Sequence, residues 1–186
     1  MDTPIPPFAM ESGEGTALET PTGDCAIVKA DTRQTGGSMT VIELVVGARR
    51  GPPLHTHHRD DELWVVLEGD FRFRAGGVLL HASTGGMAFG PRGTPHAFHN
   101  MGDEPGRLLI VTTPSGLEGF FQDFSETLRA GHGGPDVLSE VGLPYDLEFV
   151  GPPIAVSDPH QDTSTCACGC WRTEVRPSAG STHAAT

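Results

Sequence analysis

Short runs of alternating apolar and polar residues recur along the chain from about residue 25 to residue 113. In Phe71–Arg74 the rings fall on one face of an extended strand and the guanidinium groups on the other. In a second run, Ile42, Leu44 and Val46 form a wholly apolar side. Glycine-containing turn signals separate the runs at a spacing of roughly eight to ten residues. This rhythm predicts antiparallel strands in a closed or two-sheet architecture rather than alternating strands and helices.

After the strands the hydrophobic period changes to that of a helix, which we expect near residues 115–130. The apolar residues on its face are Leu117, Phe120, Phe121, Phe124 and Leu128. Ser115 and Glu118 are spaced as a capping box for this helix, and a shorter helix is predicted for residues 135–142. We expect the phenylalanine stripe to pack as core. The alternative is that it covers a pocket and lines it.

The predicted strands comprise residues 25–29, 39–46, 62–67, 71–74, 78–81, 87–89, 96–100 and 107–113. We divide the chain of 186 residues into an N-terminal arm (1–15), one domain that includes both helices (16–153) and a flexible tail (154–186). The tail contains Cys166, Cys168 and Cys170, close enough to bind a soft metal or respond to oxidation. We favour free thiols there, because no further cysteine or histidine pair follows at zinc-finger spacing.

Composition narrows the possible partners. The formal net charge of −12 argues against binding to nucleic acid or to anionic membranes. The sequence has no apolar run of 18 residues and starts without a basic or apolar leader. We therefore expect a soluble, cytoplasmic protein.

The most specific chemical signal is a set of three histidines and one glutamate. His55 and His57 are two residues apart, so on a strand both side chains point to the same face. Glu62 opens the next predicted strand, and His96 opens a later one. Neutral imidazoles and a carboxylate suit Fe, Mn, Co, Ni, Cu or Zn, and four protein ligands leave one or two positions open for a substrate. We predict one divalent transition metal per chain at these four residues.

The segments that carry these residues resemble the paired motifs of the cupin superfamily. The first reads His-x-His-x4-Glu-x6-Gly and ends at Gly69; the second reads Gly-x5-Pro-x-Gly-x2-His-x3-Asn and runs from Gly85 to Asn100. In that family the first motif supplies two His and a Glu and the second one His, which fall here on the four residues above. One position departs from the pattern, because Arg49 stands where the family has its opening glycine.

The resemblance implies an all-β fold: a cupin double-stranded β-helix, or jelly-roll barrel, with one or two short C-terminal helices and the metal in its lumen. It also favours a homodimer, to which the apolar N-terminal run Ile5–Phe8 could contribute by crossing to the partner. Segments near residues 114–121 and 148–153 are similar to those of single-domain bacterial cupins that resemble quercetin 2,3-dioxygenase.

That likeness implies a dioxygenase that cleaves a flavonol or a related aromatic or enolic molecule. Glu62 would then be both metal ligand and catalytic base, because a carboxylate beside a metal can take a proton from the substrate. The apolar residues that we expect to line the substrate pocket are Trp64, Phe73, Phe89 and Phe98. Two alternatives stay open, because one fold supports many chemistries. They are a Lewis-acid isomerase, cyclase or decarboxylase, and a non-catalytic module that binds a small ligand.

Overall fold

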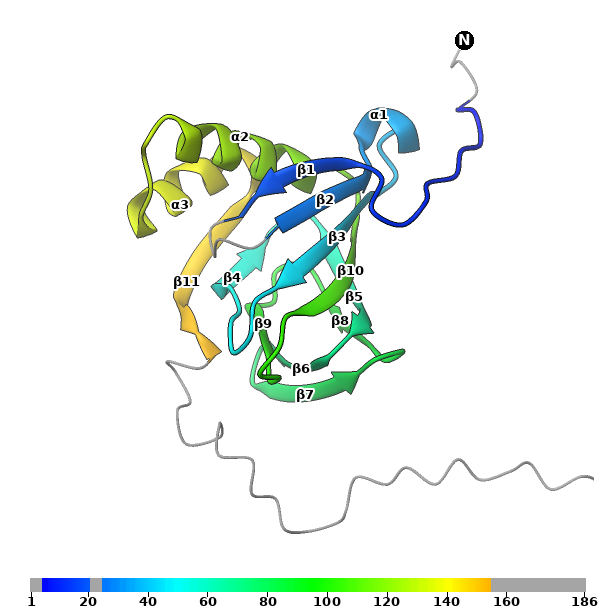
Figure 1. Ribbon diagram of the computed structural model, residues 1–186. Coiled ribbons are helices and arrows are strands. Elements are labelled where there is room, and N and C mark those ends of the chain that lie inside the picture. The colour runs from blue at the N-terminus through cyan, green and yellow to red at the C-terminus, as the bar shows by residue number, and fades with distance from the viewer. Residues whose placement is uncertain (1–4, 21–24, 155–186) are drawn as a thin grey trace, which may run out of the picture.

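The computed structural model describes residues 5–20 and 25–154, so the predicted cysteine tail lies outside the described residues. Two antiparallel sheets face each other and enclose the core (Figure 1). The six-stranded sheet has the order β1-β2-β3-β10-β5-β8 and the five-stranded sheet the order β11-β4-β9-β6-β7. The predicted all-β jelly-roll barrel with C-terminal helices is confirmed.

The bounds of the elements are β1 Thr16–Glu19, β2 Cys25–Ala30, α1 Thr32–Thr35, β3 Thr40–Val46, β4 Pro53–His57, β5 Asp61–Glu68, β6 Asp70–Ala75, β7 Val78–Ser83, β8 Met87–Gly90, β9 His96–Asn100, β10 Gly106–Thr113, α2 Leu117–Arg129, α3 Pro135–Gly142, the 3-10 helix Leu143–Tyr145 and β11 Leu147–Pro153. Every predicted strand is present within two residues at each end.

Three strands are missing from the predicted ranges, β1, β4 and β11, although His55 and His57 of β4 were expected to lie on a strand. Strand β11 contains Gly151, which has no side chain to pack, and Pro152 and Pro153, which have no backbone N–H to donate. All three weaken the sequence signal for a strand. It lies at the edge of its sheet, where proline is tolerated, and its pairing with β4 shifts register on both sides of Gly151. Strand β1 has four residues, too few for a clear alternation.

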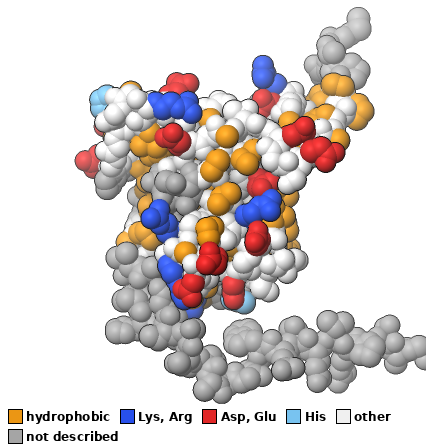
Figure 2. Space-filling model, in the orientation of Figure 1, with side chains coloured by type: hydrophobic (Ala, Val, Ile, Leu, Met, Phe, Trp, Pro, Cys, Tyr) orange, Lys and Arg blue, Asp and Glu red, His pale blue; other side chains and the backbone are white. Residues whose placement is uncertain are grey.

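Alternation places the predicted apolar sides in the interior. Buried side chains come from both sheets and include Ile42, Val46, Trp64, Val66, Phe71, Phe73 and Leu108. On the outer face, the Glu43 carboxylate pairs with Arg107 at 2.6 Å and with Lys29 at 3.9 Å. Figure 2 shows acidic, basic and apolar side chains interspersed on the face over β2, β3 and β10. No helix of the described segments is both long and apolar enough to cross a membrane.

Helix α2 lies beside the barrel, where it packs against β1, β3 and α3 (Figure 1). The predicted capping box at its start is wrong. Gly116, not Ser115, occupies the N-cap position and has no side chain to form a cap. The Glu118 carboxylate accepts from the Gly116 N–H at 3.0 Å and also from more distant donors. It accepts from the Thr32 backbone N–H at 2.8 Å and from the hydroxyl groups of Thr32 and Thr40. These bonds fix the start of α2 to the β2–β3 connection.

Replacing Glu118 by Gln tests this anchor. The amide keeps the size of the side chain but loses the charge and one acceptor at a position that is only 7% exposed. We expect the free energy of unfolding to fall by about 1–3 kcal/mol, measured by urea denaturation. Glu126→Gln, at an exposed position of the same helix, is the control. Equal stability of the two variants would contradict the anchoring role.

Candidate metal centre

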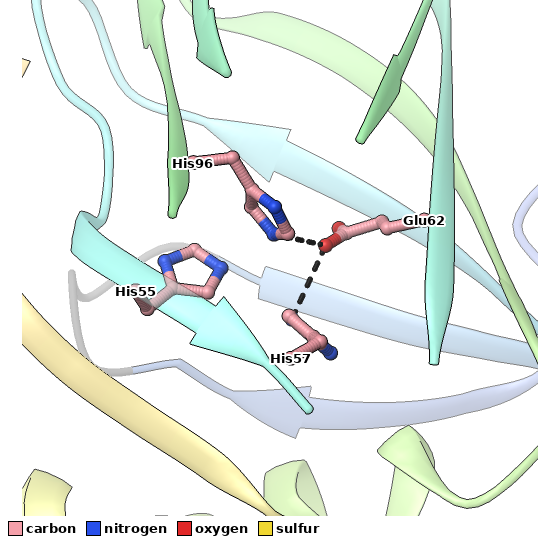
Figure 3. A group of neighbouring side chains, drawn as sticks. All are labelled: His55, His57, Glu62 and His96. Atoms are coloured by element: carbon pink, nitrogen blue, oxygen red, sulfur yellow. Dashed lines mark hydrogen bonds and ion pairs between the residues drawn. The ribbon is translucent and has the colours of Figure 1, made fainter. Parts of the chain in front are cut away.

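Three strands from the two sheets bring the predicted ligands together. Strand β4 supplies His55 and His57, β9 supplies His96, and β5 of the opposite sheet supplies Glu62 (Figure 3). His55 is paired with His96 across the β4–β9 ladder, so the register itself sets these imidazoles side by side. All four residues are buried, and one ligand atom from each lies within 4.8 Å of the others.

The Glu62 carboxylate is the centre of this group. Its Oε2 atom lies 3.1 Å from Nε2 of His96 and 3.2 Å from Nε2 of His57. The Nδ1 atom of His55 lies 2.8 Å from the Pro53 carbonyl oxygen, which can only accept a hydrogen bond. That bond places the proton of neutral His55 on Nδ1 and leaves its Nε2 lone pair free for a ligand.

The cluster fits a divalent transition metal by its own chemistry. Three imidazoles and one carboxylate, all away from water, are the donor types that such metals prefer. Buried nitrogen atoms normally have hydrogen-bond partners, yet Nδ1 of His57 and Nδ1 of His96 have none among the described residues. Ligation of the Nε2 atoms would fix both rings with their Nδ1–H groups pointing away from the metal. The donor set does not distinguish iron, manganese, nickel, cobalt, copper and zinc.

Burial and neighbouring charges keep His55 and Glu62 deprotonated, so that their lone pairs are available to a metal. Burial, followed by the nearby His96 and His57, lowers the pKa of His55 to about 3, so that His55 is neutral at pH 7. Burial alone would raise the pKa of Glu62. The interactions with His57, His96 and His55 outweigh burial and hold that pKa at about 2, which leaves Glu62 ionised.

The turn that leads into β4 is held by a residue of the second motif. The Asn100 side-chain amide donates to the carbonyl oxygens of Val46 and Gly47 at 3.1 Å each. Within this turn Arg49 has φ 56°, a left-handed conformation that favours glycine. The turn therefore keeps the glycine-like backbone although the residue is arginine, and the departure from the family pattern leaves the approach to His55 intact.

A cavity opens next to the cluster. Its lining includes His55, His57 and Glu62 together with apolar side chains from both sheets, α2 and β11, among them Leu44, Phe98, Ile110, Leu117, Phe120, Phe121, Leu147 and Phe149. The space open to the centre of a water molecule is about 70 Å³, well above what a single water needs. The cluster therefore faces a predominantly apolar chamber.

The predicted pocket residues are only partly in this lining. Phe98 lines the cavity. Trp64 and Phe73 lie in the core behind the cluster, where the Trp64 ring meets the edge of the His96 ring at a centroid distance of 5.1 Å. Gly90 makes this contact possible, because a Cβ atom there would lie 2.6 Å from the Trp64 ring. The placement of Phe89 in the pocket is wrong: it is 47% exposed, because Ala88 and Gly90 are the inward-facing residues of β8.

Sequence reasoning missed most of the wall contributed by α2 and β11. The alternative interpretation of the phenylalanine stripe, as a cover for a pocket, applies to Leu117, Phe120 and Phe121, which are at once core and cavity wall. Phe149 was not identified at all, although its ring lies 5.8 Å from that of His55 and 6.2 Å from that of Phe120. The proline-rich end of β11 concealed the strand that carries it.

Comparison with protein families identifies residues 40–112 as a cupin domain. This segment contains all four residues of the cluster. The structure is similar to KdgF from Halomonas sp., with a TM-score of 0.54 and 16% identity over 61% of this chain and 98% of that chain. Residues 40–112 thus match the cupin domain, and the structure has the cupin jelly-roll fold.

Two further solved structures share the fold. A predicted oxalate decarboxylase from Thermotoga maritima aligns with a TM-score of 0.52 and 18% identity over 57% of this chain and 99% of that chain. An RmlC-like cupin from Shewanella frigidimarina aligns with a TM-score of 0.50 and 16% identity over 57% and 89%, respectively. No curated protein matches the sequence significantly. At these identities the likeness defines the fold and leaves the reaction open.

Replacing His55, His57 or His96 individually by Ala tests the ligand set. Each change removes one of the converging nitrogen atoms, and we expect metal occupancy to fall at least about tenfold while the β-rich fold persists. Elemental analysis and circular dichroism measure the two quantities. His58→Ala is the control, because His58 is exposed and pairs with Glu148 on the outside. Undiminished metal in all three variants would refute the assignment.

Acid should destabilise the metal-free protein in a window set by His55. Between about pH 6.5 and pH 3 the unfolded chain protonates this residue and the folded chain does not, so stability falls as the pH falls. The loss per proton is at most about 1.4 kcal/mol per pH unit. Glu62, whose pKa is lowered to about 2, extends the loss below about pH 4.5. The free energy of unfolding, measured by urea denaturation at each pH in this range, should depend less steeply on pH in His55→Gln than in the wild type. The exposed His58→Gln should keep the wild-type dependence on pH.

Proposed function

We propose that this protein is a metal-dependent dioxygenase that acts on a flavonol or a related aromatic or enolic small molecule. The observation that carries the proposal is the opening of a buried cluster of three histidines and one glutamate into an apolar cavity. His55, His57, Glu62 and His96 would hold the metal. When bound, the metal would supply an electrophilic centre for a substrate oxygen and, if redox-active, a route for reaction with dioxygen.

The cavity lining supports an apolar guest with few charges. Among the described residues that line it, none is lysine or arginine, and the polar side chains apart from the cluster reduce to Thr20. Apart from the metal itself, a phosphorylated or polyanionic substrate would find no cationic partner among these lining residues. Aromatic rings at Phe98, Phe120, Phe121 and Phe149 suit a flat, partly aromatic molecule.

Glu62 is the base that the chain offers. It is ionised, buried and within hydrogen-bond distance of two imidazoles, so it can accept a proton from an enolic or phenolic hydroxyl group at the cluster. The apolar walls exclude water from the activated substrate, which limits competing hydrolysis and protonation.

A second candidate is a Lewis-acid isomerase, cyclase or decarboxylase. The donor set favours it as much as it favours an oxygenase, because imidazole and carboxylate bind redox-inert zinc as well as redox-active metals. In that case the metal would polarise a substrate carbonyl group, and Glu62 would move a proton without any need for dioxygen. We place the oxygenase first because the cavity is predominantly aromatic and aliphatic.

The requirement for dioxygen separates these candidates. We expect a panel of flavonols and simpler enols to show oxygen uptake with the metal-loaded protein and no turnover under nitrogen. Ring cleavage of a flavonol in the manner that the quercetinase likeness implies would release carbon monoxide. Glu62→Gln should retain much of the metal and lower turnover by about two to four orders of magnitude, the usual contribution of a general base. Glu148→Gln, an exposed carboxylate on β11, is the matched control.

Undiminished conversion under nitrogen, or with zinc in the site, would exclude the dioxygenase and support the Lewis-acid enzyme. Saturable ligand binding with no product in either atmosphere would indicate a binding module instead.

A further inference from the structure

Asp60 is a buried carboxylate that directly adjoins the proposed metal ligands. It follows the end of β4 and is 2% exposed. Its Oδ2 atom lies 3.6 Å from Nδ1 of His57, a contact slightly longer than a hydrogen bond. This Nδ1 atom is buried and has no hydrogen-bond partner among the described residues. Asp60 is therefore the charged group that faces the outer nitrogen of His57.

The two nitrogen atoms of His57 have opposite surroundings. Nε2 faces Glu62 at 3.2 Å, inside the cluster, while Nδ1 faces Asp60 on the other side of the ring. A ring that binds a cation through Nε2 carries its proton on Nδ1, and a carboxylate at that proton orients the ring and increases electron donation to the cation. His55 has a backbone carbonyl in the corresponding place, at Pro53.

Arg59 connects Asp60 to helix α2. Its Nε donates to Oδ1 of Asp60 at 3.1 Å, and its Nη2 donates to the Ser115 carbonyl oxygen at 3.4 Å. Gly116 leaves room for this guanidinium group, since a Cβ atom there would lie 2.2 Å from Nη2. The next residue, Leu117, begins α2 and lines the cavity. One chain of contacts thus runs from His57 to the start of the cavity wall.

We propose that Asp60 is a positioning residue that orients His57 for the metal, and that Arg59 ties this orientation to the start of α2. The inference rests on the proposed function in one respect only, that His57 binds a metal. It assigns no proton transfer to Asp60. Its role is to hold the ring, and Arg59 holds Asp60 while leaving its Oδ2 atom directed at His57.

The test uses cobalt(II) with the full-length protein. Metal-free wild-type protein, Asp60→Asn and Asp60→Ala are titrated with cobalt against a chelating indicator, and the absorption spectrum of the bound cobalt is recorded. We expect the affinity to fall about 10- to 100-fold for Asp60→Ala, less for Asp60→Asn, and the cobalt spectrum to shift in both. Arg59→Gln should lower the affinity by about two- to fivefold, as for a partly exposed pair.

Asp61→Asn is the matched control. Asp61 is the neighbouring carboxylate, but its side chain pairs with Arg92 at 2.7 Å. The Asp61→Asn variant should leave both the affinity for cobalt and the cobalt spectrum unchanged. The melting temperature of each metal-free variant, measured in parallel, separates positioning from folding.

Wild-type affinity and an unshifted cobalt spectrum in both Asp60 variants would overturn the positioning role and leave the metal proposal standing. If the Asp60 variants melt at a lower temperature but their folded fraction shows the wild-type cobalt spectrum, the positioning role is overturned as well, because a residue that only supports folding would behave in this way. A wild-type protein that binds no cobalt would overturn the metal centre itself.

Discussion

A carboxylate buried among three imidazoles is the constraint on which the rest of this structure depends. An ionised side chain away from water is costly unless opposite charge or hydrogen-bond donors surround it. Glu62 has two imidazole nitrogen atoms at 3.1 and 3.2 Å. That arrangement requires β4, β5 and β9 to meet in one register, and a shift of one residue in any of these strands would turn its ligand toward the opposite face. The β4–β9 ladder and the Asn100 clamp on the preceding turn keep the register fixed.

The sequence was most informative where the physics is local. Alternation located β2, β3 and the strands from β5 to β10 within two residues, since a strand buried on one face must repeat with a period of two. The spacing of His55, His57, Glu62 and His96 predicted a cluster that the structure does assemble. Prediction failed where distant contacts decide. Glu118 bonds to Thr32 and Thr40 as well as to the Gly116 N–H at its own helix terminus, and no local spacing reveals the two distant partners. Phe89 faces outward because of the pairing of β8, which its composition does not show.

The cavity wall was hard to predict for the same reason. Helix α2 owes its position to the Glu118 anchor at its first turn and to Arg59, which reaches the Ser115 carbonyl from the β4–β5 connection. Phe120 and Phe121 therefore line the cavity because of contacts that other residues make. One of these contacts joins Thr32 and Glu118, which are 86 positions apart. The phenylalanine stripe predicted a buried helical face. In the structure this one face both packs as core and lines the cavity.

The ligands come from one part of the chain, whereas the cavity wall comes from that part and from segments on either side of it. All four residues of the cluster lie within the segment 40–112 that matches the cupin domain. Leu44, Phe98 and Ile110 of the cavity wall lie within this segment as well, while Leu117, Phe120, Phe121 and Phe149 lie outside it. The segment that matches the cupin domain therefore contains the whole cluster, and the flanking helix and strand complete the cavity wall. Because one fold supports many chemistries, a change in this flanking wall would alter which molecule fits beside the cluster without altering the cluster itself.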